Sequence, residues 1–466
     1  MKRIRALMVG VFFVAVACGG GSDQRTVLVD YSSDEFASFL LFDFPKRVEV
    51  HPGDTLVVRQ TFTGEPHTFT GGIEPMKYVD ALGPWIDFFE GFGELQGAGV
   101  PLPNPEEPGD ATVADFAKAV KDAKPSAGRT KVIESMKALH AQDPKVPDLD
   151  NPPQQSFQDF AAYVDKVSDP KTDVPEAFTE QGVIKQNGGQ PCYLRTGVPP
   201  KDPSKGCANA DQKQPAFDGK QTFYSSGIIR YQGPQGNIYR VPLADNIAPG
   251  RYTFFCLVHG PVQKTDIVVK PKEEKIPGQD AVDREARKEI DVLIEPLRKQ
   301  FSEATKTGKL TIPGDEKRTV SGPFAGLLGA NHAAIDEFVP KRITAKAGQP
   351  ITWKMMGAEH TISFDVPKYF PPVEFLKDGT VRFNPKLHPA AGGARQRPER
   401  SGEGGGGGGA GPAKFDGGTY DGTGFWSSGL LGSEPYLEYT MRITKPGTYR
   451  VACLIHPPMV GTVVVT

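Results

Sequence analysis

Five short blocks of this sequence occur twice, in the same order and with matching residue types. In each copy an apolar, strand-like run follows the first block, and the last block, Cys-x-x-His, ends a segment that begins at a Pro-Gly turn. The paired blocks are residues 45–54 and 340–349, 66–69 and 359–362, 223–227 and 425–429, 249–252 and 446–449, and 256–259 and 453–456. This self-similarity predicts two copies of one β-rich unit.

Length and composition agree with such an organisation. The chain has 466 residues, which is enough for two or three domains. It contains 53 Gly and 43 Pro, and so much turn-forming sequence favours short strands joined by loops over a long helical bundle. Because the formal net charge is only −2, we expect no nucleic-acid partner.

The N-terminus has the pattern of an export signal. Basic residues in 1–5 precede an apolar run at 6–17, which is too short to span a bilayer as a mature helix. Small residues then lead into Cys18, and this arrangement resembles a bacterial lipobox, in which the Cys is acylated. The resemblance implies a signal peptide at 1–18, a flexible tether at 19–26, and an extracytoplasmic protein anchored by lipid to a bacterial membrane, periplasmic or on the outer cell surface. The alternative is an ordinary signal peptide with an incidental Cys.

Long insertions separate the blocks within each copy. We expect a first unit at 27–272 with an insertion at about 73–221, and a second unit at 321–466 with a Gly-rich insertion at about 370–423. The first insertion and a charged connector at 273–320 both have apolar residues at helical spacing. Cys192 and Cys207 lie among Gly, Pro and Asn in the first insertion and, outside the cytoplasm, predict a disulfide that closes a loop.

The residues that can carry chemistry lie in the repeated blocks. Copy two has His360 far upstream of Cys453, His456 and Met459, which follow the spacing Cys-x2-His-x2-Met. A thiolate, two imidazoles and a thioether are soft ligands suited to copper, and two His and a Cys with a weak axial Met form the blue-copper arrangement. A lone buried Cys is ordinarily structural, but a matched distant His in each copy favours a metal site.

Copy one departs from this pattern. It has His67, Cys256 and His259, but Val262 stands at the spacing of the axial Met. Because Val has no lone pair, we expect either a three-coordinate site or recruitment of the neighbouring Gln263 as axial ligand. Loss of the axial donor would destabilise Cu(II) more than Cu(I). The sequence therefore predicts a higher reduction potential in copy one and electron flow towards it from copy two.

On these motifs both copies resemble cupredoxins, the plastocyanin and azurin superfamily, over about residues 27–72 plus 222–270 and 336–366 plus 424–466. The resemblance implies a mainly β fold of two Greek-key β-sandwiches, with the helical insertion in the first and a connector helix between them. It also implies up to two type 1 copper sites, Cu(I)/Cu(II), with His259 and His456 nearest the surface. Thr68 and Thr361, which follow the first His, either hydrogen-bond across the site or are ordinary strand residues.

These features favour a non-catalytic electron carrier that serves redox partner proteins in the cell envelope. A multicopper oxidase or a nitrite reductase would need a second kind of copper held by further His residues. The chain has eight His in all, no His-x-His, and no His beside Cys256 or Cys453, which disfavours such an enzyme. A copper-storage, copper-delivery or sensing lipoprotein is the other alternative, although Met, His and Cys are scarce for storage.

Overall fold

The computed structural model describes residues 23–61, 66–103, 109–167, 215–229, 238–312, 315–328, 333–356, 360–366, 373–375, 381–383, 413–429, 431 and 437–466. Within these residues the fold is mainly β, with several sheets and five helices, so the predicted fold class is confirmed at this level. The expected signal peptide with Cys18, residues 19–22 of the tether, and the Cys192–Cys207 disulfide lie outside the described residues.

The first unit contains two sheets. Their orders are β3-β1-β5-β8 and β4-β10-β9-β6-β7. Apolar side chains from both sheets form one buried cluster that includes Val27, Leu56, Phe254 and Ile267. The strands are β1 (Gln24–Val29), β3 (Asp43–Phe44), β4 (Arg47–Val50), β5 (Thr55–Gln60), β6 (Thr70–Gly71), β7 (Tyr224–Ser225), β8 (Ile238–Pro242), β9 (Gly250–Cys256) and β10 (Gly260–Val269).

The second unit repeats this topology. Its sheets have the orders β2-β14-β13-β16-β22-β20 and β15-β24-β23-β17-β21. The pairs β3-β1, β1-β5 and β5-β8 of the first unit are antiparallel, parallel and antiparallel, and so are β14-β13, β13-β16 and β16-β22 of the second. In the other sheet of each unit, the pairs β4-β10 and β15-β24 are both parallel. Its strands are β13 (Phe324–Leu328), β14 (Ala333–Val339), β15 (Arg342–Ala345), β16 (Pro350–Met355), β17 (Ser363–Phe364), β20 (Ala413–Tyr420), β21 (Trp426–Ser427), β22 (Leu437–Ile443), β23 (Gly447–Ala452) and β24 (Val460–Val465).

Alternating polarity explains these strands. Along β10 and along β22 every second residue is buried, as expected for strands with one face against a core. In the second unit the core includes the fully buried side chains of Trp353 and Tyr439. Two small hairpins complete the described strands: β11 (Lys309–Ile312) with β12 (Asp315–Ser321), and β18 (Val373–Phe375) with β19 (Val381–Phe383).

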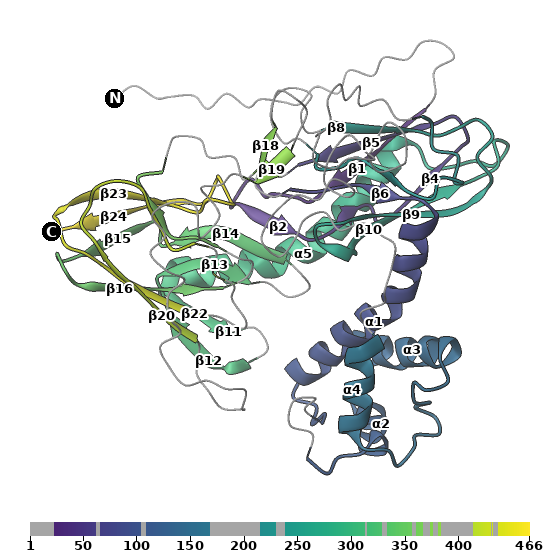
Figure 1. The fold of residues 1–466 in the computed structure, drawn as a ribbon, viewed down its shortest axis with the longest axis horizontal. Coiled ribbons are helices and arrows are strands. Elements are labelled where there is room, and N and C mark those ends of the chain that lie inside the picture. Colours follow the sequence, from purple (N-terminus) through teal and green to yellow (C-terminus); the bar gives the residue numbers. More distant parts are fainter. Residues whose placement is uncertain are drawn as a thin grey trace.

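The described part of the first insertion, up to residue 167, is mainly helical. It begins directly after β6 with α1 (Ile73–Gly97) and continues with α2 (Val113–Asp122), α3 (Ala127–Gln142) and α4 (Phe157–Val167). Thr112 and Asp115 form a capping box at the start of α2. Phe88, Phe116 and Phe160 belong to a separate apolar cluster formed by this insertion. In Figure 1, α1 runs away from the sheets, and α2, α3 and α4 gather at its far end.

Two elements join the units. The short strand β2 (Ser38–Leu40) comes from the N-terminal part of the chain but pairs with β14 of the second unit. Helix α5 (Gln279–Thr307) lies between the two groups of strands (Figure 1). Side chains of both units and of α5 form one apolar cluster, here called the shared core, which includes Leu40, Phe44, Leu297 and Ile335. None of the described helices has the length and apolar character needed to cross a membrane.

The shared core predicts that one substitution on α5 destabilises the whole protein. Leu297 is fully buried there, whereas Val292 on the same helix is 71% exposed. We expect Leu297→Ala to lower the free energy of unfolding by about 2–5 kcal/mol, and Val292→Ala to change it by less than about 0.5 kcal/mol. Denaturant unfolding of both variants measures this difference. Equal stability of the two variants would contradict the prediction.

Candidate metal centres

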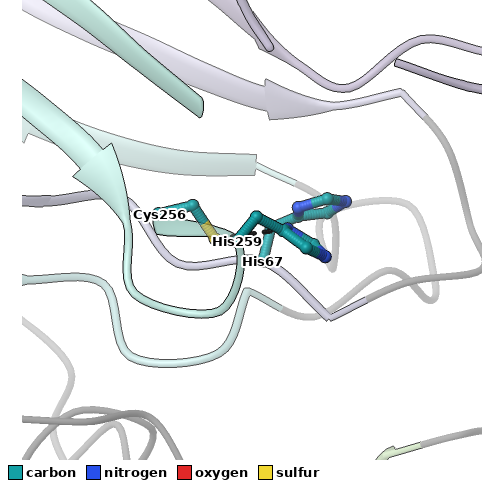
Figure 2. A group of neighbouring side chains, drawn as sticks. All are labelled: His67, Cys256 and His259. Atoms are coloured by element: carbon teal, nitrogen blue, oxygen red, sulfur yellow. Dashed lines mark hydrogen bonds between the residues drawn. The ribbon is translucent and has the colours of Figure 1, made fainter. Parts of the chain in front are cut away.

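The first candidate centre, here called centre 1, consists of His67, Cys256 and His259. His67 lies in the segment that leads into β6, Cys256 is the last residue of β9, and His259 lies in the turn before β10. Their ligand atoms all lie within 4.8 Å of one another. Sγ of Cys256 is 3.7 Å from Nδ1 of His259, and Figure 2 shows the three side chains converging from these segments.

Centre 2 consists of His360, Cys453 and His456, in the equivalent positions of the second unit. The ligand atoms again lie within 4.8 Å of one another, and all three residues are buried. Nδ1 of His360 is 3.0 Å from Nδ1 of His456, and Sγ of Cys453 is 3.5 Å from the latter nitrogen. Each centre thus directs two imidazole nitrogens and one sulfur to one point, as a trigonal metal site requires.

The fold brings the distant His to the Cys by strand pairing. In the first unit β6 pairs with β9, with Thr70 opposite Phe255. In the second unit β17 pairs with β23, with Ser363 opposite Ala452. Because each upstream His lies three residues before Thr70 or Ser363, the pairing sets it beside the strand end that carries the Cys.

The Thr after each upstream His ties this segment to the Cys. The amide of Thr68 donates to Sγ of Cys256 at 3.3 Å, and its hydroxyl accepts from the amide of Leu257 at 2.8 Å. In centre 2 the amide of Thr361 lies 3.4 Å from Sγ of Cys453 and its hydroxyl accepts from the amide of Leu454. Amide donors stabilise a thiolate, so these bonds hold each Cys in the form that binds a metal.

The repeated Ser-Ser-Gly block supports the same segment, although its sequence alone favours a simple turn. The hydroxyl of Ser226 accepts from the amide of Phe69 at 2.8 Å, and the hydroxyl of Ser225 lies 2.8 Å from that of Thr70. Ser428 and Ser427 make the corresponding bonds in the second unit. The block occurs in both copies at the same place relative to the ligands, and this repetition is the sequence feature that indicates its supporting role.

The strand register shows which residue of centre 1 corresponds to Met459 of centre 2. Lys264 of β10 is opposite Phe255, and Val460 of β24 is opposite Ala452, in each case the residue before the Cys. The residues that precede Lys264 and Val460 are Gln263 and Met459. Gln263 is therefore the counterpart of Met459, and the loop of centre 1 is one residue longer.

By this register Val262, which stands at the spacing of Met459, is not its structural counterpart, and the register favours the other expected residue, Gln263. The side chain of Val262 packs against the shared core instead. Gln263 is fully buried, and its Oε1 lies 3.1 Å from Nδ1 of His67 and 2.9 Å from Nδ1 of His259. An amide oxygen aimed at both ligand nitrogens is placed as a fourth ligand would be.

Met459 also fits an axial role. Its side chain is fully buried in the core of the second unit beside Cys453. Its carbonyl accepts from the amide of Cys453 at 3.0 Å, and its amide donates to the carbonyl of His456 at 2.8 Å. These two bonds fix the turn that carries three of the four expected ligands, so the residues of centre 2 suit copper with a weak thioether.

Burial and the neighbouring imidazoles tune the ligands of centre 1. Burial raises the pKa of the Cys256 thiol, but hydrogen bonds from His259 and His67 and their positive charges bring the pKa well below its ordinary value. Burial lowers the pKa of His67, but hydrogen bonds to Asp30 and Cys256 raise it to about 9 in total. Asp43 lies nearby, and burial raises the pKa of its carboxyl well above the ordinary value.

Centre 2 has the same character. Burial raises the pKa of the Cys453 thiol, but the charge of His456 and hydrogen bonds from both imidazoles bring it well below its ordinary value. The thiolate is the form in which Cys binds copper or zinc, and the lowered pKa at both centres favours it.

The two centres differ in access to solvent. His259 is partly exposed, but His456 is fully buried, so the expectation that His456 lies nearest the surface is wrong. Nδ1 of His456 is 3.9 Å from Oδ1 of the buried Asp336 on β14. The amide of Asp336 donates to the carbonyl of Ala37, just before β2. The N-terminal segment that joins the two units therefore lies next to centre 2.

The comparisons with known proteins give a limited result. No family model matches this chain, and no curated protein matches it. Among solved structures, a purple cupredoxin from Nitrosopumilus maritimus is similar at 15% identity and a TM-score of 0.15, covering 28% of this chain and 83% of that chain.

Two further solved structures are similar to the same extent. A plastocyanin from Dryopteris crassirhizoma has 19% identity and a TM-score of 0.14, covering 28% and 89% of the two chains. A mutant of amicyanin has 15% identity and a TM-score of 0.14, covering 28% and 73%. TM-scores this low do not establish a fold, so the similarity of the two units rests on their own strand order.

A glycine beside centre 2 allows a direct test of its geometry. Gly326 and Gly348 have φ angles of +75° and +77°, so Ala at either position brings a similar backbone strain of about 1–2 kcal/mol. A Cβ on Gly326 would overlap Nε2 of His360, whereas a Cβ on Gly348 would meet nothing within 4 Å. We expect Gly326→Ala to weaken metal binding at centre 2 by at least about tenfold, and Gly348→Ala to leave it unchanged.

Titration of the two variants with Zn(II) in a Cys256→Ser background isolates centre 2 and measures this affinity. Equal affinities would show that the ring of His360 does not need its present place to bind the metal.

Proposed function

We propose that this chain is a cupredoxin-type electron carrier with two tandem Greek-key units, each holding one type 1 copper. The observation that carries the proposal is the pair of His-Cys-His groups whose Nδ1 and Sγ atoms converge, each with a buried Gln or Met at the axial place. Two imidazoles and a thiolate with a weak axial donor suit a copper ion that cycles between Cu(I) and Cu(II).

Rigidity supports electron transfer over catalysis. The ligand residues are held by main-chain bonds and by buried hydroxyls, so little movement is needed when the metal changes its charge. An oxidase or reductase would need a further copper held by more His. Among the described residues His51 and His140 lie outside the centres, and each is hydrogen-bonded to a main-chain carbonyl. These contacts favour an electron carrier over an enzyme.

The exposure of the ligands favours centre 1 as the point of contact with partner proteins. His259 is partly exposed, and single electrons pass most readily where a ligand is near the partner. His456 is enclosed, which favours retention of the metal at centre 2 over storage or delivery to another protein. We place these partners in the cell envelope, with the chain held at the membrane by lipid on Cys18 and its first insertion closed by a Cys192–Cys207 disulfide.

Visible spectroscopy with metal counting tests this function. The chain produced without residues 1–18 is loaded with copper, and the variants Cys256→Ser and Cys453→Ser are treated alike. We expect two coppers per chain, an intense thiolate-to-Cu(II) charge-transfer band, and loss of one copper and of its share of the band in each variant. Protein that binds no copper, or that binds it without this band, would refute the proposal.

The axial residues predict the order of the reduction potentials. An amide oxygen is harder than a thioether and stabilises Cu(II), so we expect the lower potential at centre 1. This reverses the order expected from the sequence, because that order assumed that centre 1 had no axial donor. In Cys453→Ser protein, Gln263→Met should raise the potential of centre 1. In Cys256→Ser protein, Met459→Gln should lower that of centre 2.

Val262→Met is the matched control for this measurement. It adds a thioether in the same loop, but on the side that packs against the shared core. Redox titration should find its potential unchanged. If Val262→Met raises the potential of centre 1 and Gln263→Met does not, the axial place belongs to Val262 instead.

A further inference from the structure

Asp30 has an unusual backbone conformation beside centre 1. It is fully buried and has a φ of +62°, a left-handed value that costs a residue with a side chain about 1–3 kcal/mol. The strand register shows which residue of the second unit corresponds to Asp30. Leu28 pairs with Phe44 in the first unit, and Phe324 pairs with Val339 in the second. Counting two residues on from each, Asp30 corresponds to Gly326.

The carboxylate of Asp30 makes contacts that stabilise this conformation. Oδ1 accepts from the amide of Tyr31 at 2.5 Å and from the amide of Leu40 at 2.8 Å. Oδ2 lies 3.3 Å from Nε2 of His67, and both side chains are fully buried. Nδ1 of the same ring faces the site, 3.1 Å from Oε1 of Gln263. A ring held at Nε2 by an acceptor has its Nδ1 free for a metal.

Centre 2 lacks this carboxylate. At the corresponding position Gly326 has a φ of +75° and no side chain, and a Cβ there would overlap the His360 ring. Nε2 of His360 lies instead 3.2 Å from the main-chain carbonyl of Met356. The two centres therefore differ in the partner of the upstream His, which is an acidic side chain in one and a neutral carbonyl in the other.

We propose that Asp30 is a positioning residue for centre 1, which holds His67 through Nε2 and makes this ligand more electron-rich than its counterpart His360. The inference rests on the proposed copper-binding function and adds a second cause for the difference between the centres. An anionic partner increases the basicity of a metal-bound imidazole and favours Cu(II) over Cu(I). Because Leu40 on β2 binds the same carboxylate, the strand that joins the two units also fixes this contact.

The test uses the full chain with Cys453→Ser, so that only centre 1 binds metal. Asp30→Asn keeps the shape of the side chain and an acceptor for Leu40, and removes the charge. Asp30→Gly keeps the left-handed backbone and removes the side chain, as at Gly326. Asp54→Asn is the control, because Asp54 is a nearly buried carboxylate of the same unit that accepts from the amide of His51, in the turn before β5.

Three quantities are measured on each variant: the affinity for Zn(II), the affinity for Cu(II), and the reduction potential. We expect both Asp30 variants to bind Zn(II) and Cu(II) about 10–100-fold more weakly, and Asp54→Asn to bind them as the parent does. Cu(I) should be affected less. Each tenfold fall in the ratio of Cu(II) to Cu(I) affinity raises the potential by about 59 mV, so the potential of both Asp30 variants should rise above that of the parent.

The outcomes separate this inference from the function on which it rests. Asp30 variants that unfold more easily but keep the parent's affinities and potential would overturn the positioning role and leave copper binding intact. Parent protein that binds Zn(II) but no copper would refute the proposed function, and the Zn(II) affinities would still decide the role of Asp30. If the parent binds neither metal, both proposals are wrong.

Discussion

Each metal centre depends on the pairing of a two-residue strand with the strand that leads into the ligand Cys. So short a strand adds few main-chain bonds and is marginal by itself. In both units it is supported by buried hydroxyls of the neighbouring Ser-Ser-Gly block, as in the bond between Thr70 and Ser225. The first insertion begins directly after β6, so it lies between paired strands and does not interrupt their pairing. Long insertions at such positions can therefore be tolerated.

The shared core makes two similar units unequal. Strand β2 leaves the first unit to pair with β14, and α5 fills the space between the sheets. Next to centre 1, the amide of Leu40 on β2 donates to Asp30. The ring of Phe39 on β2 lies 6.5 Å from the ring of His67 and 5.5 Å from that of His259, between centroids. On the other side, the segment before β2 binds Asp336 beside His456. One short strand therefore lies next to both centres.

Much of each centre could be predicted from the sequence, because the ligand types are repeated. The spacing of Cys256 and His259 needs only a strand followed by a tight turn. The upstream His67 was identified by its place in a repeated block, and the structure brings these three together. Sequence spacing alone set Val262 opposite Met459 and left Gln263 as the alternative, because counting from the Cys assumes loops of equal length. The loop of centre 1 is one residue longer, and only the cross-strand register shows that this moves Gln263, and not Val262, into the site.

The sequence by itself determined the two β-rich copies, the helical character of the insertion and connector, and the residue types that can bind copper, since all of these follow from local pattern and repetition. Only the folded chain shows that Gln263 lies beside the ligand nitrogens of centre 1, which ligand His is partly exposed, and which group contacts each upstream His. These properties depend on residues far apart in the chain, such as Asp30 with His67 and Ala37 with Asp336. Such contacts form only when the strands pair and the units share a core, so they cannot be predicted from local sequence patterns.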